Sequence, residues 1–431
     1  MIDAYVREFE RFGANGGASP AWLAERRHAG MARFAHVGFP TAKDEEWRFT
    51  PVGPIAQASF APAPPAAVAA DALAPFLFGH PEWPLLVFVN GRYSAGLSRA
   101  RLPGGAVAES LAEAIARDPT LEQHLGRHAP VESSPFAALN TAFLKEGAYI
   151  HVPARVELPA PVHVLFVSTA DAAGTVAYPR NLFLIEREAR ASIIESYVTL
   201  APGATYFTNA VTEVVSGENA WTEHTRLQRE SEAAYHVGLT HVEQQRDSHY
   251  RSFTLAMGGE IARHNLHVRL NAPNIETLMY GLYLTRGSQL VDNHTAIYHD
   301  QPNCNSWEVY KGVLDGRSRA VFNGKVFVKP EAQKTDAKQT NRNLILSDAA
   351  RVDTKPQLEI FADDVRCTHG ATVGRLDEGA LFYARSRGIP AADARRLLTY
   401  AFAAEVVGEV ALEPVRAELD RLVLERLGSL A

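Results

Sequence analysis

The chain has 431 residues, of which 46% are hydrophobic and 21% are charged, and its formal net charge is −6. This composition is ordinary for a globular protein with a large core, and the acidic balance argues against a nucleic-acid-binding surface. With two cysteines, no apolar window near ~18 residues and no secretory pattern at the N-terminus, the sequence predicts a cytoplasmic protein without disulfides and without a membrane span.

Residues 1–147 are predicted to form a mixed α/β region. Helical patterns occupy three stretches: 1–50, 110–124 and 134–147. A Pro/Ala-rich connection at 51–75 separates the first of them from Leu85–Val89, an apolar run typical of a buried strand. Asn90 and Gly91 follow directly, and this dipeptide is a strong signal for a hairpin turn.

Short alternating strands replace the helical patterns in residues 148–375. In one of them Leu266, Val268 and Leu270 lie on the same face. Turn-then-strand units recur, and the residues that follow the turns are 191, 220, 261, 290, 320 and 352. The steps between them are 29, 41, 29, 30 and 32, which suggests stacked rungs of similar length with one longer insertion. A β-helix fits this repeat best, and a β-sandwich is the alternative.

Helical periodicity returns in residues 376–431, which are predicted to form a C-terminal helical domain. Leu397 and Phe402 belong to the apolar stripe of one helix, and Leu419 and Leu422 to that of the next. This much apolar surface requires something to pack on, either the solenoid or another protein. The predicted fold class is therefore mainly β, with a β-helix core between an N-terminal α/β region and the C-terminal helices.

The segment Asp363–Gly374 carries the strongest candidate site. If it is a strand, Cys367 and His369 project from the same face, because side chains two residues apart share a face. A thiolate and an imidazole together suit iron, zinc or a sulfur intermediate. The neighbouring Asp363 and Asp364 are compatible with a solvated turn that closes the last rung, with metal ligands or with an acid–base pair.

Other polar residues give weaker signals. Cys304 belongs to no recognisable motif and is interpreted as a structural thiol. Eight histidines of the β region lack metal-ligand spacing, and strand-surface positions are expected for them: His224, His236, His241, His249, His264, His267, His294 and His299. The chain contains no Gly-x-x-x-x-Gly-Lys-[Ser/Thr] pattern, so the sequence predicts no ATP site.

Several long motifs resemble the SufB/SufD family of iron–sulfur cluster assembly proteins. They are Lys43–Arg48, Arg319–Lys325, Lys334–Ala337, Gln339–Asn341, Val352–Ile360, the segment with Cys367 and His369, and Leu381–Ile389. Within the family, the sequence His-Gly-Ala-Thr-Val-Gly at 369–374 and the small number of cysteines are more similar to the SufD branch than to the SufB branch.

The resemblance implies a right-handed parallel β-helix and a role as a non-enzymatic scaffold subunit of the SUF iron–sulfur cluster assembly complex. The implied partners are a SufB-like paralogue and the SufC ABC-type ATPase, and the ATPase is expected to dock on the helices of residues 376–431. The isolated chain could form a homodimer.

The resemblance also places His369 at the surface that faces the SufB-like subunit. There it is a candidate ligand of iron or of a transient iron–sulfur cluster shared by the two subunits, with Cys367 as a second candidate. Two other functions compete with this one. A free-standing β-helix enzyme acting on polysaccharide would use Asp363 and Asp364, whereas an interaction module without metal chemistry would need neither Cys367 nor His369.

Overall fold

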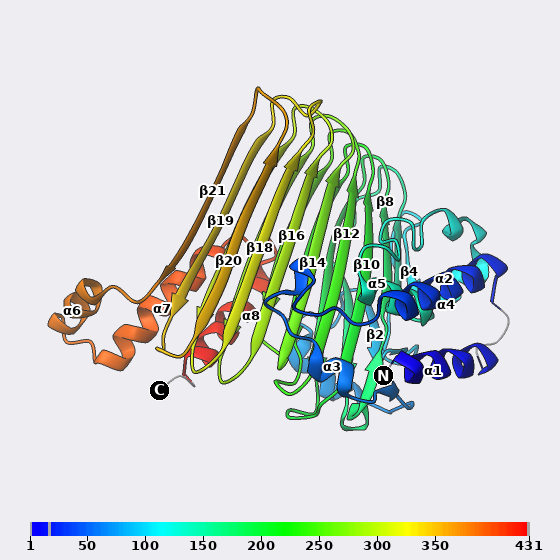
Figure 1. Cartoon of the computed structure of the whole chain (residues 1–431), viewed down its shortest axis with the longest axis horizontal. Coiled ribbons are helices and arrows are strands. Elements are labelled where there is room, and N and C mark those ends of the chain that lie inside the picture. Colours follow the sequence, from blue (N-terminus) through cyan, green and yellow to red (C-terminus); the bar gives the residue numbers. More distant parts are fainter. Residues whose placement is uncertain (1, 16–18, 429–431) are drawn as a thin grey trace.

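The computed structural model describes residues 2–15 and 19–428, so the predicted domain limits at residues 1 and 431 lie outside it. Figure 1 shows two long sheets whose strands run side by side as a solenoid, with the N-terminal helices towards one end and the C-terminal helices towards the other. The predicted mainly β fold, with a parallel β-solenoid between helical flanks, is confirmed.

Each of the two sheets is built almost entirely from parallel pairs. Sheet A has the order β20-β18-β16-β14-β12-β10-β8-β5-β4, and sheet B has the order β21-β19-β17-β15-β13-β11-β9-β6-β2-β3. The strands of sheet A are β4 (Val107–Ser110), β5 (Ala148–Val152), β8 (Arg180–Ile185), β10 (Phe207–Ser216), β12 (Tyr235–Gln244), β14 (Ile261–Leu270), β16 (Leu290–His299), β18 (Arg319–Val328) and β20 (Arg351–Ile360), with β1 (Ala61–Pro62) and β7 (Thr175–Ala177) beside this path. The strands of sheet B are β2 (Leu85–Val89), β3 (Arg92–Tyr93), β6 (Val162–Ser168), β9 (Arg190–Thr199), β11 (Trp221–Arg229), β13 (His249–Ala256), β15 (Glu276–Thr285), β17 (Asn305–Leu314), β19 (Asp336–Ile345) and β21 (Arg366–Gly374). The exceptions to parallel pairing are β2–β3 and β4–β5, which are antiparallel.

Each turn of the solenoid contributes one strand to each sheet. From β9 onward the strands of sheet B begin at residues 190, 221, 249, 276, 305, 336 and 366, and from β8 onward those of sheet A begin at 180, 207, 235, 261, 290, 319 and 351. The repeat is therefore 26 to 32 residues in both sheets. The predicted longer insertion is wrong. The step of 41 connects the turn before β11, in sheet B, with the turn before β14, in sheet A. Turns before strands of either sheet have the same sequence pattern, so turns of the two sheets were counted as one series.

The parallel register places side chains of the same kind next to one another on successive turns of the solenoid. Val242, Val268, Ile297 and Val326 are consecutive partners in sheet A, and all four are buried. β-branched side chains suit this arrangement because they pack well on a pleated surface. The strands of the middle turns are covered on both faces, so polar as well as apolar side chains are buried along them, as in β10 and β12.

The N-terminal region contains the predicted strand and hairpin. β2 and β3 pair through Asn90 and Gly91, whose φ angles of 49° and 76° are the positive values that this turn requires. The helical stretches become α1 (Ile2–Asn15), α2 (Ala21–Val37), α4 (Leu111–Arg117) and α5 (Pro135–Ala142). The predicted irregular connection holds α3 (Gly53–Gln57), β1 and a 3-10 turn at Ala70–Phe76. The predicted helix over 110–124 is interrupted, since a separate 3-10 turn begins at Pro119.

The C-terminal helices are α6 (Glu378–Ser386), α7 (Ala391–Val407) and α8 (Glu413–Gly428). α7 and α8 pack on the outer face of sheet B, in an apolar cluster that joins Val406, Val407, Val415, Leu419, Leu422 and Val423 to Leu227, Phe253, Leu255 and Leu282. Arg229 pairs with Glu418 at 2.9 Å at the edge of this contact. The solenoid is therefore the packing partner of these two helices. Across the described ranges, no helix has both the length and the apolar character needed to cross a membrane.

Candidate functional site

The last turn of the solenoid presents a free edge in both sheets. β20 and β21 each stand at the end of their sheet, and within the described chain each pairs with a strand on one side only. Nearly all residues of β21 are exposed. The unpaired N–H and C=O groups of such an edge are a template for pairing with another chain.

Cys367 and His369 lie on β21 and project from one face, as predicted. Their register partners on β19 are Ala337 and Gln339, and both of these side chains are buried inside the solenoid. Cys367 is half-buried against the apolar cluster at the end of the core, and burial raises the pKa of its thiol. His369 is exposed. The two side chains therefore face the open end of the solenoid interior, with the imidazole accessible to solvent.

Asp363 and Asp364 form the turn between β20 and β21, and both are exposed. The carboxylate of Asp364 is paired with Lys334, and its backbone N–H donates to Gln333 Oε1 at 2.9 Å. The backbone N–H of Lys334 in return donates to the carbonyl of Asp364 at 2.7 Å. These contacts fasten the turn to the one before it, so the pair forms the predicted solvated turn that closes the last rung.

The structure brings together a second group of polar side chains that the sequence reasoning missed. It is buried in the first turns of the solenoid and consists of Glu195, His224, Arg226, Glu230 and His236. His224 Nε2 lies 2.9 Å from Glu195 Oε2, and His236 Nδ1 lies 2.6 Å from Glu230 Oε2. Burial by itself raises the pKa of Glu195, but hydrogen bonding and charge from His224, together with the charge of Arg226, outweigh it and lower the pKa to about 2. The group is thus a charge-paired network closed to solvent.

The expectation of strand-surface histidines is wrong for most of the eight. Six are buried: His224, His236, His241, His264, His294 and His299. Sheet B covers the inner face of sheet A, and the N-terminal region covers much of its outer face, so a polar residue can be buried on either side of a strand. His294 illustrates this, because its ring lies between Asp292 and Glu46 of the N-terminal region, at 3.1 and 3.2 Å. The local pattern around a histidine does not reveal which faces are covered.

The buried histidines predict a loss of stability in mild acid. Burial lowers the pKa of the buried His163 and His299 to about 3 each, and it lowers the pKa of the buried His264 well below the ordinary value of 6.5. Below pH 6.5 the unfolded chain therefore binds protons that the folded chain does not, and stability falls as the pH falls. Burial raises the pKa of Glu308 from 4.5 to about 7, which acts in the opposite direction over the same range.

We expect the free energy of unfolding to drop by about 3 kcal/mol between pH 6 and pH 5, at about 1.4 kcal/mol per histidine less the contribution of Glu308. Urea denaturation at the two pH values measures this drop. His163→Gln is the matched variant, because the imidazole Nε2 lies 2.9 Å from Ser196 Oγ and an amide can replace that contact. Its drop should be smaller by about 1 kcal/mol. Equal stability at pH 6 and pH 5 would contradict the prediction.

Cys304 is a structural thiol, as interpreted from the sequence. Its side chain is fully buried, and Sγ donates to the carbonyl of Ala272 at 3.3 Å. Burial raises the pKa of the thiol to about 11, so it is not a thiolate near neutral pH. Within residues 2–15 and 19–428, no three His, Cys, Asp or Glu side chains converge in a way that could hold a metal ion.

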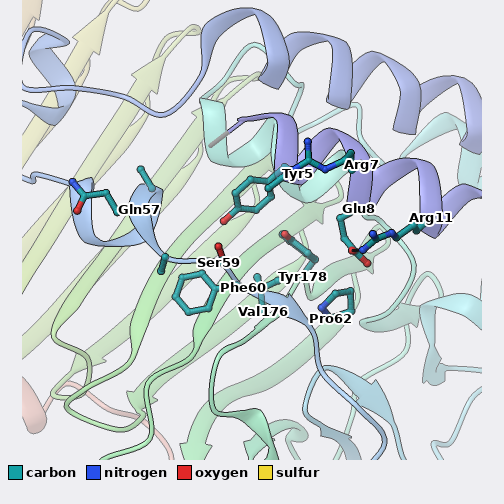
Figure 2. A pocket seen from close by; sticks show the side chains of 13 residues that line it. Tyr5, Arg7, Glu8, Arg11, Gln57, Ser59, Phe60, Pro62, Val176 and Tyr178 are labelled. Atoms are coloured by element: carbon teal, nitrogen blue, oxygen red, sulfur yellow. Dashed lines mark hydrogen bonds and ion pairs between the residues drawn. The ribbon is translucent and has the colours of Figure 1, made fainter.

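A cavity of about 360 Å³ lies in the N-terminal region, beside α1. Figure 2 shows the hydroxyl groups of Tyr5 and Tyr178 near this space, with Phe60 below them and Arg11 beside Glu8. Burial raises the pKa of Tyr5 to about 12, and Arg11 pairs with Glu8 at 3.4 Å. None of the described residues that line the cavity is a cysteine or a histidine. Because α1 is at the opposite end of the solenoid from β21, the cavity is separate from the Cys367/His369 site (Figure 1).

Comparison with known proteins identifies the family to which this chain belongs. Residues 166–402 match the family described as SUF system FeS cluster assembly, SufBD core domain, and residues 15–164 match the SufBD protein N-terminal region. An iron-sulfur cluster assembly SufBD family protein of Synechocystis sp. is 33% identical over 98% of this chain and 95% of its own length. The iron-sulfur cluster assembly protein SufD of Escherichia coli is 34% identical over 92% of this chain and 90% of its own length, and SufD of Bacillus subtilis is 30% identical over 68% and 67%. The chain therefore belongs to the SufBD family of iron–sulfur cluster assembly proteins, and within it is SufD-like.

Proposed function

We propose that this chain is a scaffold subunit that builds nascent iron–sulfur clusters together with a SufB-like paralogue and a SufC-like ABC ATPase in the cytoplasm. The proposal rests on one observation: in the last turn of the solenoid, a free strand edge and the exposed His369 lie side by side. An edge supplies the means of pairing with another chain, and the imidazole supplies a ligand at that junction. The chain itself acts as a scaffold and not as an enzyme, and the ATPase provides the energy.

The paralogue adds its own edge strands to β20 and β21, so that the two solenoids form continuous sheets. Apolar side chains left exposed at this end support such a contact, since Phe361 is 59% exposed and Val373 is 47% exposed. In the absence of the paralogue, a second copy of this chain occupies the same surface and gives a homodimer.

The nascent cluster is transient and is held between the two subunits. His369 and Cys367 are the ligands from this chain, and the paralogue supplies the remaining ones. An imidazole and a thiolate both bind iron well. The polysaccharide-acting enzyme is not favoured, because Asp364 is already paired with Lys334 in a turn and the relatives are named as cluster assembly proteins.

Co-expression with the paralogue and the ATPase, followed by anaerobic reconstitution with iron and sulfide, tests the proposal. The purified complex should contain all three chains and should show cluster absorption. Val373→Asp should remove the paralogue from the complex, because it places a charge in the contact at the strand edge. Val37→Asp is the control, since Val37 is also exposed, at 36%, but lies at the end of α2. A Val373→Asp chain that still co-purifies with the paralogue would rule out the edge contact.

The ATPase docks mainly on α6. α7 and α8 bury their apolar faces on sheet B, whereas Phe382 and Tyr383 of α6 are 73% and 61% exposed. Exposed neighbouring aromatic side chains are typical anchors of protein interfaces. Replacing both by serine should weaken ATPase binding at least about tenfold, measured by calorimetry. Leu424→Ser on α8 is the control, because Leu424 is 52% exposed and lies outside α6. Unchanged affinity of the double variant would exclude α6 as the docking site.

A further inference from the structure

Three polar side chains form one row at the end of the solenoid interior. Glu308 on β17 is the register partner of Gln339 on β19, and Gln339 is the register partner of His369 on β21. Partners on neighbouring parallel strands lie about 4.8 Å apart and point to the same face. The row therefore runs from a buried carboxyl group, through a buried amide, to the exposed imidazole.

The amide of Gln339 is held in one orientation. Its Nε2 donates to Glu308 Oε2 at 2.8 Å, and the residue is only 2% exposed. The side chain occupies space left by Gly324 on the opposite sheet, where an added Cβ would lie 2.3 Å from Gln339 Nε2. Because the NH₂ group faces the carboxyl group, the oxygen is left for another donor.

That oxygen lacks a donor within the described chain. Gln339 Oε1 is buried and accepts no hydrogen bond from residues 2–15 or 19–428. A buried carbonyl oxygen without a partner costs free energy, so a donor is expected to come from a group that moves towards it. The next side chain in the row is His369, whose ring carries an N–H and lies on the adjacent strand.

We infer that Gln339 is a positioning residue for His369: its Oε1 accepts a hydrogen bond from one ring nitrogen while the other ring nitrogen binds the metal. This inference rests on the proposed function, in which His369 is a ligand. Histidines that bind metals commonly donate their second N–H to a carboxylate or carbonyl group, which sets the tautomer and the direction of the ring. Here the amide takes that role, and Glu308 holds the amide in place.

The test uses the complex of this chain with the SufB-like paralogue, because the paralogue supplies the remaining ligands, and Co²⁺ is the probe. Gln339→Met keeps an unbranched side chain of similar size but removes the acceptor, and we expect it to lower Co²⁺ affinity about 10- to 100-fold. In the wild type, the exchangeable ring N–H of the Co²⁺-bound histidine should give a hyperfine-shifted proton signal in water. Gln339→Met should lose this signal by fast exchange. Lys338→Ala, on the outer face of the same strand, should change neither result.

The outcomes separate the inference from the proposed function. If Gln339→Met binds Co²⁺ as the wild type does and keeps the ring N–H signal, while His369→Ala loses binding, the positioning role is wrong and the ligand role stands. If His369→Ala binds Co²⁺ as tightly as the wild type, the ligand role fails and the inference fails with it. Should Gln339→Met not fold, Gly324→Ala is the second variant, because its Cβ displaces the Gln339 amide. Wild-type affinity and signal in Gly324→Ala would equally overturn the inference.

Discussion

Replacing His369 by alanine is expected to reduce cluster formation in the assembled complex at least about tenfold. The ring is exposed at the open end of the solenoid, so its removal deletes a ligand without creating a cavity in the core. Folding and binding of the paralogue should therefore change little. Cluster yield is measured by absorbance and by iron and sulfide content after anaerobic reconstitution, and partner binding is measured by co-purification.

Cys367→Ser is the comparison variant for His369→Ala. Its effect on cluster yield should be smaller, because the paralogue can supply a thiolate in place of Cys367. The thiol is also half-buried against the apolar end of the core, and burial raises its pKa, which disfavours the thiolate in the isolated chain. The ligand role of His369 fails if His369→Ala lowers the melting temperature and the affinity for the paralogue as much as it lowers cluster yield. In that case the ring is a packing element of the interface.

Replacing Arg180 by alanine is expected to destabilise the protein by about 3–5 kcal/mol. Arg180 and Glu213 are fully buried, and the Nε and Nη2 groups of Arg180 donate to Glu213 Oε2 at 3.0 and 2.8 Å. Glu213 also accepts hydrogen bonds from the backbone N–H groups of Gly126 and Ala129. The pair therefore fastens a loop of the N-terminal region to sheet A. Without Arg180, the carboxylate of Glu213 remains buried and loses the guanidinium group that pairs with it at 2.8 Å.

Urea denaturation of Arg180→Ala at pH 7 measures this loss. Arg117→Ala is the matched control, because Arg117 also pairs with a glutamate, Glu109, but its side chain is 56% exposed. An exposed pair contributes little to stability, so the control should change the free energy of unfolding by less than about 1 kcal/mol. A loss in Arg180→Ala no larger than that of Arg117→Ala would show that the backbone N–H groups alone stabilise Glu213.

Much of the fold could be predicted because the local periodicity of the sequence indicates it. A spacing near 30 residues indicated stacked rungs, since each rung must bury its apolar face on the next. An i, i+3, i+4 stripe identified α7 and α8, and the two-residue alternation placed Cys367 and His369 on one face of a strand. Even the error in the repeat was local in origin, because turns before the two sheets look alike in sequence.

The buried polar groups could not be predicted in the same way. His294 and Arg180 are each on a strand of sheet A, and nothing in their immediate neighbours distinguishes them from surface residues. Their burial depends on segments far away in the chain, since Glu46 covers His294 and the loop around Gly126 covers the partner of Arg180. Whether a polar side chain is buried depends on tertiary contacts with distant segments. The pattern of its neighbours in the sequence therefore does not predict its burial.

The candidate site also has features that the sequence determined and features that only the tertiary structure determined. Residue types and alternation alone determined that β21 carries a thiol and an imidazole on one face, because side-chain direction in a strand follows from position. Only the tertiary structure decided that this strand is the last of its sheet, that its edge is free, and that Gln339 and Glu308 lie behind His369 in one row. These facts depend on how many turns the solenoid completes and on the register between strands about 30 residues apart, which the long-range hydrogen bonds of the sheets set.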